Sequence, residues 1–380
     1  MTAPEPFKSA AAQRKLRGGW LVGGGLWMVA AWCGQAVAAP LDGLLTAAPD
    51  TGASTFSLAL ATDHMNSSLD IFKVRSNDAS LESANTGDYS GQHLTAIWQA
   101  APDVWLSGSW WRRAVISAAD TYRYNSWQVS GQYRFLQARD AWPAMAVRLS
   151  SWGNEASATE TTSPVRVPGA ILNTVKITQP ADQQVQLDLV GSWQLTPASE
   201  LSLFASGGVS RLSYGGLSAT TTQNGCNYQL QFTGNSIYGS LAPSCSGSSG
   251  VIEQFFDSSG DYGVDVAKEI AWRGKFIQLG VNGNWRNGPW KLAAGYHVNV
   301  ISRSDVDQIL RARSKTPYTS NKALVLQANY RFNNTFSTFA QAQYNTNLFF
   351  NDLPVTYNSS TSERFSRSYS LYTVGVRADF

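Results

Sequence analysis

The closing stretch of the chain reads Ser368-Tyr369-Ser370-Leu371-Tyr372-Thr373-Val374-Gly375-Val376-Arg377-Ala378-Asp379-Phe380. Counting back in twos from the terminal Phe380 gives the apolar residues Ala378, Val376, Val374 and Tyr372, whereas the residues between them are mostly polar. Successive side chains of a strand point to opposite faces, so this alternation predicts a strand whose two faces meet different surroundings.

The same residues resemble the final strand of bacterial outer-membrane β-barrel proteins. In that family the last strand carries an assembly signal: a polar residue, a glycine two positions later, and alternating hydrophobic residues that end in Phe. Here Thr373, Gly375, Ala378 and Phe380 occupy these positions. The resemblance implies an antiparallel β-barrel in the outer membrane of a Gram-negative bacterium, with the outer-membrane lipid and the barrel assembly machinery as partners.

The first 38 residues have the organisation of a cleaved secretory signal peptide. A basic region precedes the apolar run Trp20–Cys33, and Ala36-Val37-Ala38 supplies a small-x-small cleavage site before Ala39. The basic residues are Lys8, Arg14, Lys15 and Arg17. Together with Glu5 they account for the whole net charge of +3, so the mature chain is formally neutral and offers no basic patch for nucleic acid.

Two cysteines remain in the mature chain, Cys226 and Cys245. An even pair in an exported protein suggests a disulfide, here within one surface loop. A metal site is the alternative, although no histidine lies near these cysteines in the sequence.

Alternating segments predict twelve strands. They span about 54–63, 91–99, 104–113, 122–136, 143–153, 184–195, 200–214, 274–286, 290–302, 322–332, 335–347 and 368–380. Outside the signal peptide no run of about 18 apolar residues exists, and aromatic residues make up 12% of the chain. Such a pattern favours a transmembrane up-and-down barrel over a soluble sandwich.

The connections alternate between tight turns and long polar loops, as in outer-membrane barrels. This parity favours twelve strands over fourteen and places both termini in the periplasm. The domain organisation is then a signal peptide (1–38), a periplasmic lead-in (39–53) and a barrel (54–380). The longest external loops are 154–182 and 215–272. The lead-in has no periodicity, and a plug helix at Leu41–Leu45 would be very short.

The inward-facing set is polar and mostly uncharged. Candidate lumen-lining residues are Arg134, Arg148, Asp188, Lys291, Arg331, Arg377, Trp105 and Trp111. Amides with some arginine and aromatic groups suit the passage of a neutral or weakly anionic solute such as a saccharide. A twelve-stranded barrel is also narrow enough for side chains to fill it.

Only three histidines occur, His64, His93 and His297. Asp63, His64 and Asn66 lie near one rim, within reach of His93, and form the one hint of a catalytic group. No sequence motif predicts a cofactor or a metal. The first interpretation is therefore a porin-like channel for small hydrophilic solutes. The alternative is a non-conducting barrel that acts through its external loops in structure, adhesion or secretion. A lipid-modifying enzyme ranks third.

Overall fold

The protein is described by a computed structural model. It describes residues 43–49, 54–65, 88–117, 120–139, 141–162, 164–167, 170–223, 225–241, 254–257, 265–347, 352–359 and 361–380. The predicted signal peptide, Asn66 and Cys245 lie outside these ranges, so the predictions for them stay untested.

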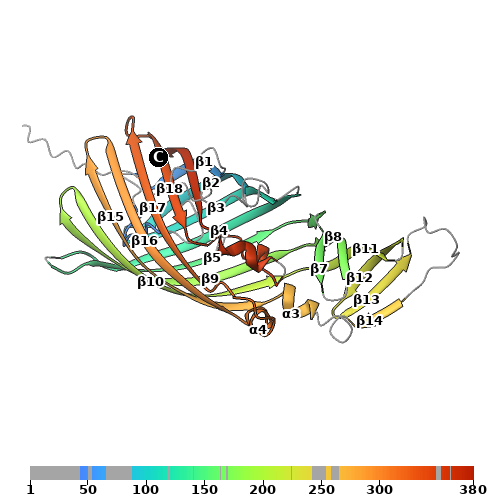
Figure 1. Cartoon of the computed structure of the whole chain (residues 1–380). Coiled ribbons are helices and arrows are strands. Elements are labelled where there is room, and N and C mark those ends of the chain that lie inside the picture. Colours follow the sequence, from blue (N-terminus) through green and yellow to red (C-terminus); the bar gives the residue numbers. More distant parts are fainter. Residues whose placement is uncertain are drawn as a thin grey trace, which may run out of the picture. The chain divides into compact units, whose positions relative to one another are not determined.

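Within the described residues, twelve antiparallel strands close a barrel (Figure 1). The strands are β1 (Phe56–Met65), β2 (Asp88–Ala101), β3 (Val104–Ser117), β4 (Asp120–Leu136), β5 (Ala144–Glu155), β9 (Ala181–Thr196), β10 (Ser199–Ser213), β15 (Arg273–Asn287), β16 (Trp290–Arg303), β17 (Ser320–Arg331), β18 (Phe336–Asn345) and β19 (Tyr369–Asp379). Closure joins β1 to β19, with Ser57 opposite Asp379 and His64 opposite Tyr372.

The predicted all-β fold class is confirmed, with twelve barrel strands rather than fourteen among the described residues. Each predicted strand lies within four residues of the observed one at both ends. The closing strand has the predicted faces, because Thr373 and Gly375 are buried while Val374 and Val376 are exposed. Period-2 alternation located these strands because each lies between two different environments.

The barrel wall is apolar outside and polar inside. Large apolar side chains on the outer face are strongly exposed, among them Leu60 at 58%, Leu149 at 57% and Ile277 at 60%. Polar side chains on the inner face are buried, among them Ser202 at 0% and Asp188 at 1%. This is the reverse of a protein that is stable in water, and an apolar solvent around the barrel explains it.

A second, seven-stranded antiparallel sheet is built from the two segments that the sequence analysis treated as external loops. It contains β6 (Ala158–Thr161), β7 (Val165–Val167), β8 (Ala170–Thr178), β11 (Gly216–Gln223), β12 (Cys226–Thr233), β13 (Ser236–Leu241) and β14 (Gln254–Asp257). Strand order is β14-β13-β12-β11-β8-β6, and β7 pairs with β8. The alternation Tyr228, Leu230, Phe232 belongs to β12 of this sheet.

Short helices lie between the later barrel strands. They are α3 (Val266–Ile270), α4 (Val306–Ala312), η2 (Pro354–Thr356) and η3 (Ser362–Ser366). Among the described residues, none of the helices is long and apolar enough to cross a membrane.

Candidate functional site in the barrel lumen

The lumen has two ends that differ in their connections. At the turn end, short turns join the strands, as at 197–198 and 288–289; at the loop end, long connections precede β2, β9, β15 and β19. Residues 43–49, here called the plug segment, contact the wall in the turn half. Residues 352–359 and 361–368, here called the cap loop, fill the loop half.

The plug segment is held in the turn half by its own backbone. The side-chain amide of Asn282 donates a hydrogen bond to the carbonyl of Leu45 (2.6 Å), and that of Gln132 donates to the carbonyl of Thr46 (3.0 Å). The backbone N–H of Ala47 donates to Ser192 Oγ at 2.8 Å. The sequence analysis expected a periplasmic lead-in at 39–53; its described part lies in the lumen and contains no helix.

Apolar contacts complete the seat of the plug segment. Leu45 packs with Val190 and Phe204, and Ala47 packs with Ala144 and Ala146. The segment passes close to strand β16 at Gly295, where a Cβ atom would lie 2.3 Å from the carbonyl oxygen of Gly43. The absence of a side chain at Gly295 is therefore what lets the segment pass.

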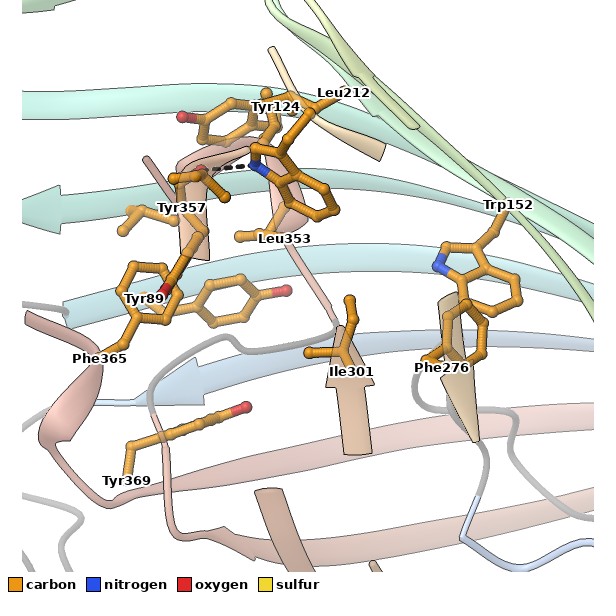
Figure 2. Close-up of a cluster of buried hydrophobic side chains, with 14 of the residues drawn as sticks. Tyr89, Tyr124, Trp152, Leu212, Phe276, Ile301, Leu353, Tyr357, Phe365 and Tyr369 are labelled. Carbon is orange, nitrogen blue, oxygen red and sulfur yellow. Dashed lines mark hydrogen bonds between the residues drawn. The ribbon is translucent and has the colours of Figure 1, made fainter. Parts of the chain in front are cut away.

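The cap loop contributes to an apolar cluster that spans the loop half (Figure 2). Its members Leu353, Val355, Tyr357 and Phe365 are 0–8% exposed. They meet wall residues from many strands. These are Met65, Tyr89, Val115, Tyr124, Trp152, Leu212, Phe276, Ile301, Tyr369 and Leu371. The rings of Tyr357 and Phe365 meet edge to face, with centroids 4.9 Å apart.

Polar groups fix the position of the cap loop. Arg113 Nη1 and Asn154 Nδ2 both donate to the carbonyl of Asp352, at 3.2 and 3.1 Å. Asp182 accepts the backbone N–H of Val355 at 2.8 Å. Burial raises the pKa of the Asp352 carboxyl, against the opposing effects of the Arg113 charge and of the hydrogen bond from Tyr369.

A second anchor of the cap loop is ionic. Glu269 on α3 accepts hydrogen bonds from Arg313 at 2.5 and 2.8 Å, and from the hydroxyl of Ser359. Trp272 Nε1 donates to the carbonyl of Tyr357 at 2.9 Å. The loop half is therefore closed by an apolar core with charged supports.

Between the two closures lies a belt of buried amides. Gln128, Gln278 and Asn299 are at most 2% exposed, and none of their side-chain polar atoms has a hydrogen-bond partner among the described residues. Buried amides left without partners cost free energy, and proteins normally pair them with water or with a ligand. Single unpartnered oxygen atoms from nearby residues add to the belt. They belong to Ser150, Gln184, Gln186, Ser206 and Gln327.

The eight candidate lumen residues lie on the inner face of the wall. Arg134 pairs with Asp103 at 2.6 Å and lies over the Trp105 ring at 5.4 Å. Arg148 lies opposite Asp188 in the β5–β9 register. Lys291, Trp111 and Arg377 are fully or almost fully buried. Arg331 lies at the end of β17.

The inward arginines have structural contacts in this state. Arg377 contacts Asp379 and Ser57, each at 2.6 Å. Their role in lining a passage for solute stays a prediction. The alternation along β4 also turns Gln128 and Gln132 inward, but nothing in that alternation distinguishes them from other polar wall residues.

The histidines do not form one catalytic group. His93 is buried in the lumen and bonds Asp63 Oδ2 at 2.9 Å, while Thr373 donates to Asp63 Oδ1 at 2.7 Å. His64 is the next residue after Asp63 on β1 and therefore points to the opposite face. Among the described residues, no cluster of His, Cys, Asp or Glu is arranged to hold a metal ion.

Gly375, from the resemblance to the assembly signal, has a packing reason in this barrel. Phe339 lies across from it in the register, and a Cβ at Gly375 would lie 2.3 Å from that ring. The same arrangement recurs where Phe204 covers Gly280. Inward aromatic rings thus lie flat against glycines of the neighbouring strand. Cys226 begins β12; its pairing with Cys245 stays a prediction.

Comparisons with known proteins give a likeness of fold only. No protein-family model and no curated protein matches the chain. Three similar solved structures are the following. The KdgM porin has a TM-score of 0.36 at 9% identity, covering 85% of this chain and 99% of that one. The translocator domain of the autotransporter NalP from Neisseria meningitidis has a TM-score of 0.45 at 8% identity, covering 86% and 89%. LpxR from Salmonella typhimurium has a TM-score of 0.40 at 8% identity, covering 85% and 100%.

Proposed function

We propose that this protein is a porin-like channel of the outer membrane for small hydrophilic solutes, closed at rest by the plug segment and the cap loop in series. The observation that carries the proposal is the belt of buried, unpartnered amides, Gln128, Gln278 and Asn299. An interior that served only as a packed core would be expected to satisfy or replace these groups. In an open state, water or a polar solute would pair with them.

The membrane location rests on the outer surface of the barrel. Lipid cannot hydrogen-bond the backbone, so a sheet in lipid has to close on itself, and all twelve barrel strands are paired on both sides. The exposed apolar side chains outside suit the hydrocarbon layer. The Thr373–Phe380 pattern and the leader sequence add to this proposal.

Closure in series follows from the burial of the lumen. A cavity of about 30 Å³ lies beside the plug segment, lined by Thr46, Pro49, Trp105 and Gln132 among others. It has room for about one or two water molecules. Passage of a solute therefore requires both the plug segment and the cap loop to move.

The solute class follows from the charge of the belt. Its members are uncharged amides and hydroxyls, and the neighbouring Arg148 and Asp188 lie opposite each other. A lumen of this kind favours neutral solutes over strongly charged ones, because it offers hydrogen bonds without a net charge.

The test is solute flux into liposomes that contain a variant lacking residues 43–49 and with residues 352–366 replaced by a short Gly-Ser linker. We expect rapid entry of small neutral sugars and amides, and slower entry of dianions of the same size. The unaltered protein should admit little. No flux through the double variant, when it is folded, would remove the channel proposal.

The alternative is a barrel without conductance that acts through its seven-stranded sheet. The observation in its favour is that the described lumen is filled, while the sheet exposes Ile171 at 48% and Tyr238 at 46%. It predicts no flux through either protein, and a loss of function when β11–β13 are removed but the barrel is left intact.

A further inference from the structure

We infer that the wall of the turn half is a binding site for short, uncharged peptides, and that the plug segment occupies it as a tethered mimic of such a ligand. This inference deepens the proposed channel and rests on it for the claim that these peptides are carried. The binding site itself is inferred from the set of contacts between the wall and the plug segment.

The wall forms its hydrogen bonds with the peptide backbone. Asn282 and Gln132 donate to two successive carbonyls, those of Leu45 and Thr46, and Ser192 accepts the next N–H, that of Ala47. Two donors followed by an acceptor match the order of groups along one peptide chain. The three wall side chains are 3–6% exposed, so water competes little for these hydrogen bonds.

The wall also sets limits on the size of the ligand's side chains. Ala47 fits between Ala144 and Ala146, which leave little room for a larger residue. Leu45 has an apolar contact surface from Val190 and Phe204. The site therefore favours a larger apolar side chain at the first of these positions and a small one two residues later.

At the first residue of the segment, β16 leaves room for the peptide backbone but not for a side chain. Gly295 meets the carbonyl of Gly43, and a Cβ on Gly43 would lie 2.6 Å from His297 Nδ1. His297 Nδ1 is buried and has no partner in the described residues. A bound peptide with a polar group at this point would satisfy it, which the plug segment does not do.

The site continues toward the amide belt. Gln278 lies four residues from Asn282 on β15, on the same face of the strand, and both its polar side-chain atoms lack partners. Gln278 thus offers a further amide on the wall, between the plug segment and the loop half. The same chemistry, amide donors toward successive carbonyls, thus extends along the path of the proposed channel.

The experiment is calorimetric titration of the detergent-solubilised variant lacking residues 43–49 with the peptide acetyl-Gly-Leu-Leu-Thr-Ala-Ala-Pro-amide. We expect the peptide to bind this variant saturably. Binding to the unaltered protein should be at least tenfold weaker, because its own plug segment occupies the site. An ester in place of the amide between Thr and the first Ala removes one N–H and weakens one carbonyl. This ester should weaken binding about tenfold, as expected for one hydrogen bond lost and one weakened.

Wall variants provide matched controls. Asn282→Ala should weaken binding about fivefold, the effect of one hydrogen bond. Asn284→Ala changes the same residue type on the same inner face of β15, two positions further toward the turn end, and should leave binding unchanged. Where the deletion fails to fold, Leu45→Asp in the full chain expels the segment by placing a charge in an apolar contact and serves in its place.

The outcomes separate this inference from the proposed function. Three results would overturn the peptide site, even where the flux assay shows an open channel. They are no peptide binding, equal effects of Asn282→Ala and Asn284→Ala, or binding of maltotriose as tight as that of the peptide. Peptide binding without flux would leave the site in place and remove the channel.

Discussion

The two halves of the lumen are closed by different kinds of interaction. The plug segment in the turn half rests on a few hydrogen bonds to its backbone and on contacts of Leu45 and Ala47. The cap loop in the loop half is part of an apolar core with charged supports at Glu269 and Asp352. The turn half is therefore closed mainly through hydrogen bonds to the backbone of one segment, and the loop half by a small hydrophobic core.

This difference predicts where stability is concentrated. Truncating a side chain of the loop-half core should destabilise the whole loop end of the barrel, because wall residues and cap-loop residues both belong to that core. Removing the plug segment should change the barrel's stability little, because its contacts lie on a wall that is already closed by backbone hydrogen bonds.

The largest effect is expected for Trp152→Ala. Trp152 is 1% exposed, and its ring centroid lies 6.0 Å from that of Phe276. The substitution should cost about 3–5 kcal/mol of unfolding free energy, through lost burial and the cavity left behind. Urea unfolding followed by gel mobility measures it. Trp142→Ala, at a residue that is 73% exposed, is the control and should have little effect.

A smaller effect is expected for Arg313→Gln, which removes the cation that donates twice to Glu269. Because Arg313 is itself partly exposed, the cost should be about 1–2 kcal/mol. The loss of stability should be confined to the cap loop. Limited proteolysis should therefore cut the cap loop faster than in the unaltered protein, whereas cleavage of the plug segment should not change. Arg311→Gln, on the exposed face of α4 just before Arg313, is the matched control. Equal cleavage in both variants would contradict the proposed anchor.

Gly295→Ala separates the two halves most cleanly. The new Cβ would lie 2.3 Å from the carbonyl of Gly43, so the plug segment has to move. Hydrogen exchange of residues 43–49 should accelerate, whereas the unfolding free energy should change by less than about 1 kcal/mol. Gly207→Ala adds a Cβ that meets nothing within 4 Å and should leave exchange unchanged. A global loss of stability in Gly295→Ala would mean that the segment is part of the barrel's core.

The smallest effect concerns pH. Burial raises the pKa of Asp352 above its unfolded value, so its contribution to the cap loop's stability is complete at low pH and is lost as the pH rises through the folded pKa. The cap loop should therefore resist proteolysis slightly better at acid pH than at neutral pH. Asp352→Asn, which cannot ionise, should reduce this difference. The same pH dependence in both proteins would assign it to other groups.

The fold was predictable where the two faces of a strand differ, as at Leu60 and Asp63 on β1. The inward position of Arg148, Asp188 and Trp105 followed from the same alternation. The plug segment was not predictable, because Gly-Leu-Leu-Thr-Ala-Ala-Pro has no period and its seat is formed by residues far away in the chain, such as Asn282.

The second sheet was missed for a different reason. Its strands alternate too, as Tyr228, Leu230 and Phe232 do in β12, but the parity of long and short connections assigned that segment to a loop. The pairing of Asp63 with His93 was within reach of the sequence, since both were placed near one rim. The opposite orientation of His64 follows from its position next to Asp63.

Single-channel recording of four proteins tests closure in series most directly: the unaltered chain, the variant lacking 43–49, the variant with 352–366 replaced by a linker, and the variant with both changes. The account predicts rare, brief openings in the first three and sustained conductance in the fourth. Full conductance after either single change would mean that only one of the two elements closes the lumen. No conductance in the folded double variant would contradict the account, because the lumen would then be a core and not a channel.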